Sequence, residues 1–368
     1  MVDKKSNLKY IICAVITIVV IIALVELSGV FQNGSMPDNA KVKKVIDMAG
    51  REVPLPPEIN GIAATSPPVS MTLYMLAPDK MLAWNSDQSG IKYMPEKYRT
   101  LPVTGGWFST QTGNYETFLS MSPDVVFEGF DYQSDPGTTI EERQQNMGSI
   151  PVVAVMDARD ARNYPASIEF LGKVLGAEEK ANELISFYTR MYKVVNTTVA
   201  GIPESEKKRV YYAEGPKGLQ TDPSGSYHSQ LIDMCGGINV ANGPINMGSG
   251  MTQVSMEEII QWNPDIIIAN NPQFYNGVYS DPLWQNITAV KNKEVYLTPS
   301  APFNWFDRPP GTNTIIGIPW TAKVLYPERF QDLDISALTK EFYSDFYHYD
   351  LTDGEVNSIL RSSGLRDI

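Results

Sequence analysis

Two stretches of this chain, NYETFLSMSPDVVFEGF (Asn114–Phe130) and VSMEEIIQWNPDIIIAN (Val254–Asn270), repeat one pattern. In each stretch a Glu is followed seven residues later by Pro-Asp and then by three large apolar residues. The matching acids are Glu116 and Glu257, which lie 141 residues apart in the sequence. A pattern of this length, written twice at equivalent places, indicates that the chain contains two related structural units.

The residues within each copy predict a short helix that leads into a buried strand. Asn114 and Ser255 occupy equivalent positions, and both residue types are favourable helix N-caps. Pro123 and Pro264 disfavour helical geometry at the residue before them, so the helix ends there. The apolar triplets that follow, VVF and III, are typical of parallel strands that are buried on both faces.

The rest of the chain alternates apolar strand-like segments with helical segments. This alternation favours an α/β fold with mostly parallel sheets. Residues 36–165 and 201–368 each contain such a series, and the second series ends in a helical tail. Between them, apolar residues recur on one face of a single long helix over 166–200. We therefore predict two β/α lobes, 36–165 and 201–368, bridged by that helix.

The N-terminus carries a membrane-targeting pattern over residues 1–35. Three Lys precede an apolar run from Tyr10 to Val25, which is long enough to be either a signal-peptide core or a short spanning helix. No small-residue cleavage site follows, so we expect an uncleaved anchor, with a cleaved signal segment as the alternative. Positive charge before the run places the remainder of the chain on the extracytoplasmic face of the membrane.

Composition excludes several classes of function. The formal net charge of -12 argues against nucleic acid as a partner, because nucleic-acid binding requires a basic surface. The chain has 2 Cys and 2 His, which disfavours a disulfide framework and any metal centre built from these residues. We expect no cofactor and no resident metal. Asn33, Asn196 and Asn286 begin glycosylation sequons, whose use the sequence does not decide.

Catalysis and a structural role are the two classes of function that compete with ligand binding. Ser226 and His228 could be drawn as a nucleophile and its base. However, the chain has no nucleophile elbow, phosphate-binding loop, dinucleotide fingerprint or zinc-protease motif. A surface-layer or adhesion protein would favour all-β repeats, which the β/α alternation contradicts. We therefore predict a binding protein that is not an enzyme.

Five segments in order carry a resemblance to a known family. They are the two Glu-to-Pro-Asp stretches together with VIDMAGREVPLP (Val45–Pro56), GSYHSQLIDMCGGINVAN (Gly225–Asn242) and AVKNKEVYLTP (Ala289–Pro299). Together they resemble the iron-siderophore and cobalamin substrate-binding proteins of ABC importers, over residues 43–335. The chain departs from the family in lacking a lipid-anchoring Cys and in the residues after Phe330.

The resemblance implies a ligand cleft between two lobes that a rigid helix joins, with little hinge motion and no catalysis. It also implies a membrane permease with a cytoplasmic ATPase as the partner. By motif position, Glu116 and Glu257 match the family's lobe-surface glutamates, which dock to arginines of the permease. The alternative for both acids is stabilisation of the helix dipole in the first turn. We expect the chain to act as a monomer.

Loops at the carboxyl ends of strands line the ligand crevice in open α/β sheets. In this chain these loops are rich in aromatic residues beside Gly and Pro, which suits contact with a bulky ligand. The candidate ligand contacts are Trp84, Trp107, Phe108, Tyr227, His228, Trp305, Phe306 and Arg308. Arg308 could hold an anionic ligand. The alternatives are ordinary packing for Trp107 and Trp305, a structural ion pair for Arg308, and a helix-start role for His228.

Three ligand classes remain open. An iron chelate of the siderophore type is the first expectation, because aromatics and Arg308 suit a bulky anionic complex. A corrinoid is the alternative, with His228 as a possible axial ligand. An oxyanion or another metal complex is third. A bare metal ion is disfavoured, because the chain lacks a cage of His and carboxylates.

Overall fold

The computed structural model describes residues 43–109, 111–130, 136–156, 159–246 and 250–366. The chain divides into two units, Met1–Val42 and Lys43–Ile368. The predicted membrane segment falls in the first unit and therefore outside the described residues. Among the helices of the described ranges, none is long and apolar enough to cross a membrane.

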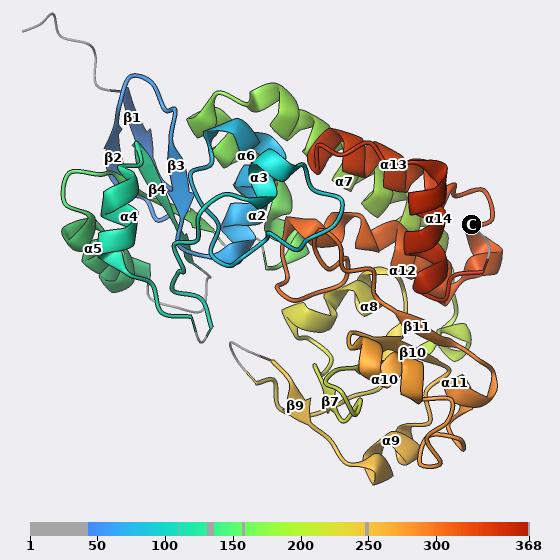
Figure 1. The fold of residues 1–368 in the computed structure, drawn as a ribbon. Coiled ribbons are helices and arrows are strands. Elements are labelled where there is room, and N and C mark those ends of the chain that lie inside the picture. The colour runs from blue at the N-terminus through green and yellow to red at the C-terminus, as the bar shows by residue number, and fades with distance from the viewer. Residues whose placement is uncertain (1–42, 110, 131–135, 157–158, 247–249, 367–368) are drawn as a thin grey trace, which may run out of the picture. The chain divides into compact units, whose positions relative to one another are not determined.

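The N-terminal lobe is built on a three-stranded parallel sheet in the order β3-β4-β5 (Figure 1). A hairpin of two antiparallel strands, β1 and β2, precedes this sheet. The strands are β1 (Lys43–Ile46), β2 (Glu52–Leu55), β3 (Ile62–Ala64), β4 (Val125–Phe130) and β5 (Val152–Met156). The helices are α2 (Pro67–Leu76), α3 (Glu96–Arg99), α4 (Tyr115–Met121) and α5 (Pro136–Met147).

The C-terminal lobe is built on a four-stranded parallel sheet in the order β11-β10-β6-β8. A short antiparallel pair, β7 and β9, lies beside it. The strands are β6 (Arg209–Ala213), β7 (Gln220–Thr221), β8 (Ile238–Asn239), β9 (Thr252–Gln253), β10 (Ile266–Ala269) and β11 (Val295–Leu297). The helices are α8 (Gln230–Met234), α9 (Met256–Trp262), α10 (Pro272–Gly277), α11 (Thr288–Lys291), α12 (Gly317–Leu325), α13 (Ile335–Phe346) and α14 (Asp353–Ser362). The prediction of an α/β fold with parallel sheets is confirmed.

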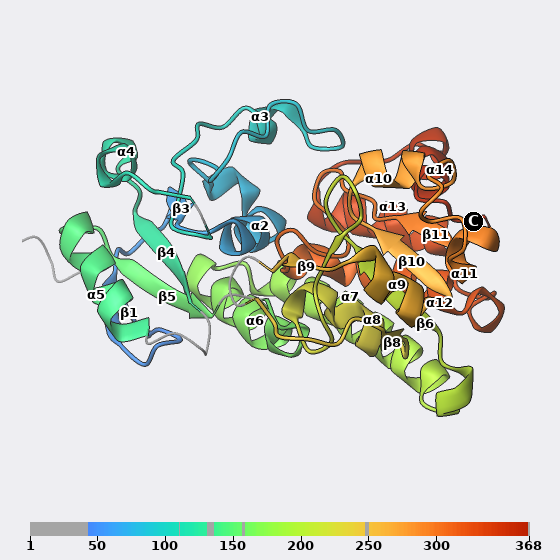
Figure 2. The same ribbon diagram turned by 90° about the horizontal axis from the view of Figure 1, so that it is seen from below.

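The connection between the lobes differs from the single helix expected over 166–200. It consists of two helices, α6 (Tyr164–Leu175) and α7 (Glu178–Val199), which Figure 2 shows side by side along one side of the lobes. Gly176 separates them in a left-handed conformation, with φ of 67°. Gly172 lets the two helices approach, because a Cβ there would lie 2.5 Å from the Cβ of Ala181. The helical pattern in the sequence was therefore correct, but the glycines end one helix and start another.

Both copies of the repeated pattern form the same element pair. α4 and α9 are seven-residue helices, and their N-caps Asn114 and Ser255 each accept a backbone N–H. Both helices end in a left-handed residue, Ser122 or Asn263, before the Pro-Asp pair. The apolar triplets then enter β4 and β10, which lie inside their sheets. The prediction of a short helix that feeds a buried strand is confirmed in both lobes.

One continuous hydrophobic core joins the lobes, and each sheet also packs a smaller core on its other face. Successive side chains of a strand point to opposite faces. Val125 therefore contributes to the shared core, whereas Val126 packs on the outer face of the N-terminal sheet. In the C-terminal sheet, Ile268 contributes to the shared core and Ile267 packs on the outer face. Because the shared core includes α6, α7 and both sheets, it couples the lobes by packing.

The helical tail packs on the N-terminal lobe as well as on its own lobe. The hydroxyl of Tyr74 in α2 donates to the carbonyl of Tyr347 at 2.5 Å, and the carbonyl of Tyr74 lies 2.9 Å from Nε2 of His348. Thr72 in α2 contacts Thr312 through their hydroxyls at 3.0 Å. These buried bonds give the lobes a second connection, independent of α6 and α7.

Candidate functional site

A cluster of buried charges surrounds Arg308 at the carboxyl end of the C-terminal sheet. The Nε of Arg308 donates to Glu214 at 2.7 Å and lies 3.0 Å from Oδ2 of Asp307. Its Nη2 donates to Asp222 at 2.6 Å and also to Glu214. The three carboxylate side chains are fully buried, whereas 19% of the Arg308 side chain is exposed. The guanidinium is therefore held in one orientation from several directions.

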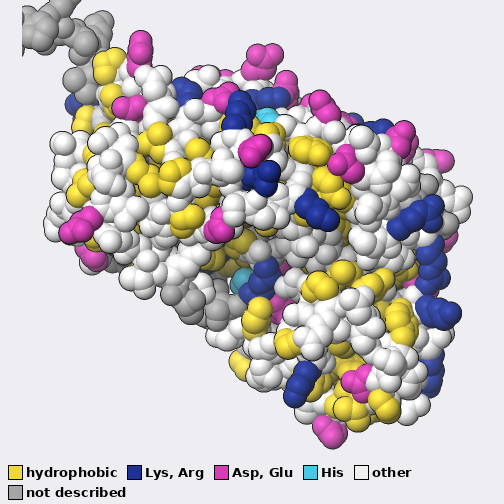
Figure 3. All heavy atoms as spheres, viewed as in Figure 1, with side chains coloured by type: hydrophobic (Ala, Val, Ile, Leu, Met, Phe, Trp, Pro, Cys, Tyr) yellow, Lys and Arg dark blue, Asp and Glu magenta, His cyan; other side chains and the backbone are white. Residues whose placement is uncertain are grey.

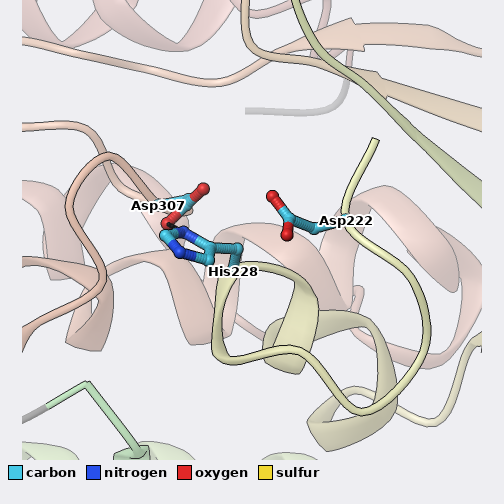
Figure 4. Close-up of side chains that lie close together, drawn as sticks. All are labelled: Asp222, His228 and Asp307. Atoms are coloured by element: carbon cyan, nitrogen blue, oxygen red, sulfur yellow. Dashed lines mark hydrogen bonds and ion pairs between the residues drawn. The ribbon is translucent and has the colours of Figure 1, made fainter. Parts of the chain in front are cut away.

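Strand ends bring these residues together. Glu214 follows β6 directly, and Asp222 follows β7. Asp307 lies in the loop after β11, where its Oδ2 accepts a hydrogen bond from Tyr212 at 3.2 Å. His228 lies in a short 3-10 turn, and its Nδ1 is 2.7 Å from Oδ1 of Asp307. Figure 4 shows His228 against Asp307, with the carboxylates of Asp222 and Asp307 facing each other.

Burial decides the charge of one member of the cluster. Glu214 lies beside Asp222 and Asp307, and burial, more than any neighbour, raises the pKa of Glu214 to about 9. Arg308 opposes this rise but does not cancel it. Glu214 is therefore protonated at neutral pH and carries no charge beside the guanidinium.

Asp222, His228 and Asp307 are the described residues whose ligand atoms lie close enough together, within 4.8 Å, to hold a metal ion. However, the guanidinium of Arg308 already contacts both carboxylates. A metal ion would have to displace this cation or share its partners, so the arrangement favours an ion-pair cluster over a metal centre.

Two cavities meet at Arg308 between the lobes, where Figure 3 shows a hollow with His and charged side chains gathered in it. The first has a volume of about 310 Å³ and the second about 290 Å³. Both are bordered by Pro67, Ser86, Arg308 and Pro309. The first cavity is also lined by Ser70, Met71, Trp84, Asn85, Gln88, Asn270, Ser300, Pro302, Phe303 and Asn304. The second is also lined by Phe108, Ser109, Gln111 and His228.

Four of the eight predicted ligand contacts border this cleft. Trp84 is buried in the wall of the first cavity, where its Nε1 donates to the carbonyl of Tyr98 at 2.8 Å. Phe108 and His228 border the second cavity from opposite lobes. Arg308 borders both cavities.

The other four predicted contacts border neither cavity. Trp305 and Phe306 are buried, and Trp305 donates from Nε1 to the hydroxyl of Tyr343 at 3.2 Å. The ring of Phe306 packs on Tyr212 at 4.8 Å between centroids. Tyr227 is half-buried in the same turn as His228.

Trp107, the fourth of these, is half-buried and packs against the smaller core of the N-terminal lobe. Its ring lies 4.6 Å from that of Tyr115 and stacks on Phe118 at 5.5 Å, while Arg143 lies over its face at 4.0 Å. Gly113 covers the ring, since a Cβ there would come within 2.6 Å of it. Trp107 therefore supports the loop that carries Phe108 and borders neither cavity.

The two predicted docking residues are exposed on corresponding helices. Glu116 lies in the first turn of α4, and Glu257 lies in the first turn of α9. Their neighbour Glu258 completes a capping box with Ser255, so Glu257 is not needed for capping. Figure 1 shows α4 in one lobe and α9 in the other.

Sequence reasoning missed the polar wall of the first cavity. Asn85 donates to the carbonyls of Ala64 and Gly105, and its Oδ1 accepts from Ser70 at 2.6 Å. Asn304 accepts from two backbone N–H groups and donates to Thr298 at 3.0 Å. Glu214 and Asp222 were also missed, although an acid directly after a buried strand was a signal that could have identified Glu214.

Comparisons with known proteins identify the family. Residues 62–302 match the model of the periplasmic binding protein family. The chain is 29% identical to the molybdate-binding protein MolA of Haemophilus influenzae over 250 residues, which cover 64% of this chain and 70% of MolA. It is 24% identical to the Fe(3+)-citrate-binding protein YfmC of Bacillus subtilis over 194 residues, covering 50% of this chain and 56% of that protein.

A solved structure shows the same similarity to solute-binding proteins. The ABC transporter solute-binding protein from Sulfurospirillum deleyianum is 34% identical, with a TM-score of 0.80. The match covers 86% of this chain and 99% of that one. The similarity therefore extends across both lobes and the connection between them.

Proposed function

Because the chain belongs to the periplasmic binding protein family and is a substrate-binding protein of an ABC importer, we propose that it captures a compact oxyanion of the molybdate type in its inter-lobe cleft. Family members are solute-binding proteins and not enzymes, and they act with a membrane permease. This ligand stood third among the sequence-based expectations. The cleft and the similarity to MolA now support it ahead of the iron chelate and the corrinoid.

The lining of the first cavity carries this proposal. Seven of its lining residues bear a hydroxyl or a primary amide, and Arg308 is the charged residue of this lining. The side chains of Ser70, Asn85, Gln88 and Asn304 already donate within the protein, so Ser86, Asn270 and Ser300 supply the donors for a ligand. Neutral hydrogen-bond donors around one guanidinium suit a small oxyanion, which accepts hydrogen bonds on every oxygen. A volume of about 310 Å³ is at the small end of the range for ligand sites, which disfavours a corrinoid.

The charges near the cleft allow an anion to bind. Glu214, Asp222 and Asp307 would repel it, but their side chains are fully buried behind Arg308. Glu214 is neutral at pH 7, because burial raises its pKa to about 9. The cation of Arg308 is the member of the cluster that borders both cavities.

A compact iron chelate is the second candidate. Trp84 and Phe303 form an aromatic wall in the first cavity, with ring centroids 5.8 Å apart. Such a wall suits the apolar part of a chelator, and the relative YfmC is named for ferric citrate. We rank it second because most of the remaining lining is polar.

Isothermal titration of the full-length chain with molybdate, tungstate, sulfate, ferric citrate and cobalamin tests the proposal. We expect saturable binding of molybdate or tungstate, which Ser86→Ala and Asn270→Ala weaken at least about tenfold. Ser280→Ala, a change at an exposed residue outside both cavities, is the matched control and should bind normally. Binding of ferric citrate alone would favour the second candidate, and binding of neither would overturn the oxyanion assignment.

Delivery to the permease is proposed to occur through Glu116 and Glu257. Both acids are exposed, and they hold the same position in two structurally equivalent helices, one in each lobe. A permease with two equivalent basic sites would match this arrangement. We also propose that the chain acts as a monomer and that residues 1–35 tether it to the membrane, on the basis of their apolar run.

A further inference from the structure

Each helix that carries a proposed docking acid also exposes a large apolar side chain one turn further on. Leu119 in α4 is 40% exposed, and Ile260 in α9 is 51% exposed. Each lies three residues after its acid, Glu116 or Glu257. Residues three apart on a helix are neighbours on its surface, so each acid and its apolar residue share one face.

The two pairs are equivalent in structure as well as in sequence. The residue before each exposed apolar side chain, Phe118 or Ile259, is fully buried in its own lobe. This burial sets the rotation of each helix and directs the next residue outward. Leu119 and Ile260 are thus exposed for the same geometric reason, at the same position of the same element.

Exposure of single apolar residues on a protein surface is ordinary. Leu119 and Ile260 differ from such isolated residues, because they occupy matched positions on two helices. The core contacts and neighbouring sequences of these helices differ, yet the exposed apolar residue is present in both. A polar residue at either position would leave the helix and its buried contact unchanged. A partner with two equivalent sites accounts for the same pair being present twice.

We infer that Glu116–Leu119 and Glu257–Ile260 are two matched docking pairs for the membrane subunits of the importer, each fitting a basic residue beside an apolar depression. This inference rests on the proposed function, because the partner is the permease. The acid of each pair selects a basic site and contributes attraction that salt screens. The apolar residue contributes burial that salt does not screen.

Salt dependence separates the two contributions. We would measure binding of the full-length chain to its permease–ATPase complex in nanodiscs, at about 50 mM and about 500 mM NaCl. Leu119→Ser and Ile260→Ser should each weaken binding about tenfold at both salt concentrations. Glu116→Gln and Glu257→Gln should weaken it mainly at low salt. Val194→Ser changes an equally exposed apolar residue on α7, and binding should be unaffected.

Several outcomes would overturn the inference. Normal binding by both serine variants, with weakened binding by both glutamine variants, would mean that the docking surface is purely ionic. A dimer of the free chain that Leu119→Ser or Ile260→Ser dissociates, seen by light scattering, would assign these residues to a second copy instead. If the unmodified chain takes up molybdate but does not bind the permease, the proposed delivery itself fails, which titration with molybdate distinguishes from a failure of ligand binding.

Discussion

Asp124 and Asp265, one in each lobe, both bond to the start of a neighbouring parallel strand, and the side chain of Asp124 accepts one hydrogen bond more than that of Asp265. Oδ2 of Asp124 accepts from the backbone N–H of Asn60 at 2.7 Å and of Gly61 at 2.8 Å. Oδ2 of Asp265 accepts from the N–H of Arg209 at 3.0 Å. Each Asp also donates its own N–H, at 2.8 Å, to the carbonyl of Gly61 or Arg209. The Asp of the repeated Pro-Asp pair thus anchors the strand beside it.

Asp124→Ala should lower the free energy of unfolding by about 1.5 kcal/mol, because a charged acceptor of two N–H groups is lost. Asp124→Asn, which keeps an acceptor oxygen in place, should cost less. Urea denaturation followed by circular dichroism measures both values. Equal stability of Asp124→Ala and the unmodified chain would show that the anchor contributes nothing.

Arg308→Met should destabilise the protein strongly, because it leaves Asp222 and Asp307 buried without their cation and Glu214 without its hydrogen-bond donor. Removal of one partner from a buried ion cluster costs roughly 3–5 kcal/mol. Arg308→Lys keeps the charge but cannot reproduce the forked contacts, so an intermediate loss is expected. Denaturant unfolding at pH 7 orders the three proteins, and Arg308→Met unfolding at the same urea concentration as the unmodified chain would contradict the prediction.

Glu214 should make stability fall as the pH rises. Burial raises its folded-state pKa from 4.5 to about 9, so between these values the folded chain keeps a proton that the unfolded chain releases. This contribution is fully present below pH 4.5 and is lost as the pH rises through about 9. Glu214→Gln removes it, so the variant should gain stability relative to the unmodified chain as the pH rises. Parallel unfolding curves at every pH would argue that Glu214 is ionised in the folded protein.

His348 should act in the opposite direction, at acid pH. Burial lowers the pKa of His348 more than the hydrogen bond to the Tyr74 carbonyl raises it. Below the ordinary value of 6.5 the unfolded chain therefore binds a proton that the folded chain resists, and stability falls as the pH drops. His348→Gln should weaken this dependence between pH 7 and pH 5. Thermal unfolding over that interval is the measurement, and an unchanged slope would exclude His348 as its source.

Trp107→Ala should reduce stability more than ligand affinity. The ring packs on Tyr115, Phe118 and Arg143 but is half-buried, so its removal should cost about 2 kcal/mol, less than for an aromatic residue of the core. Because Trp107 borders neither cavity at Arg308, its ligand affinity should change less than that of Asn270→Ala. A larger loss of affinity for Trp107→Ala than for Asn270→Ala would return Trp107 to the ligand site.

Local sequence predicted the elements well, because the interactions that set them are close in the chain. The N-caps Asn114 and Ser255 bond within their own first turns, as their residue types predict. Prediction was weaker where residues that favour a helix and glycines that end one occur in the same segment. The pattern over 166–200 is helical throughout, and the break between α6 and α7 is seen in the left-handed conformation of Gly176 and the packing of Gly172 against Ala181.

By itself, the sequence determined the two related lobes, the strands that lie inside their sheets and the loops that meet at the cleft. Hydrophobic periodicity and capping decide these features, and both depend on residues within a few positions of each other. Only the tertiary structure decided which loop side chains face the cleft. Arg308 is oriented by Glu214 and Asp222, which lie 94 and 86 residues away in the chain. Trp305, three residues from Arg308, is instead buried against Tyr343, because partners from distant segments determine the direction of each loop side chain.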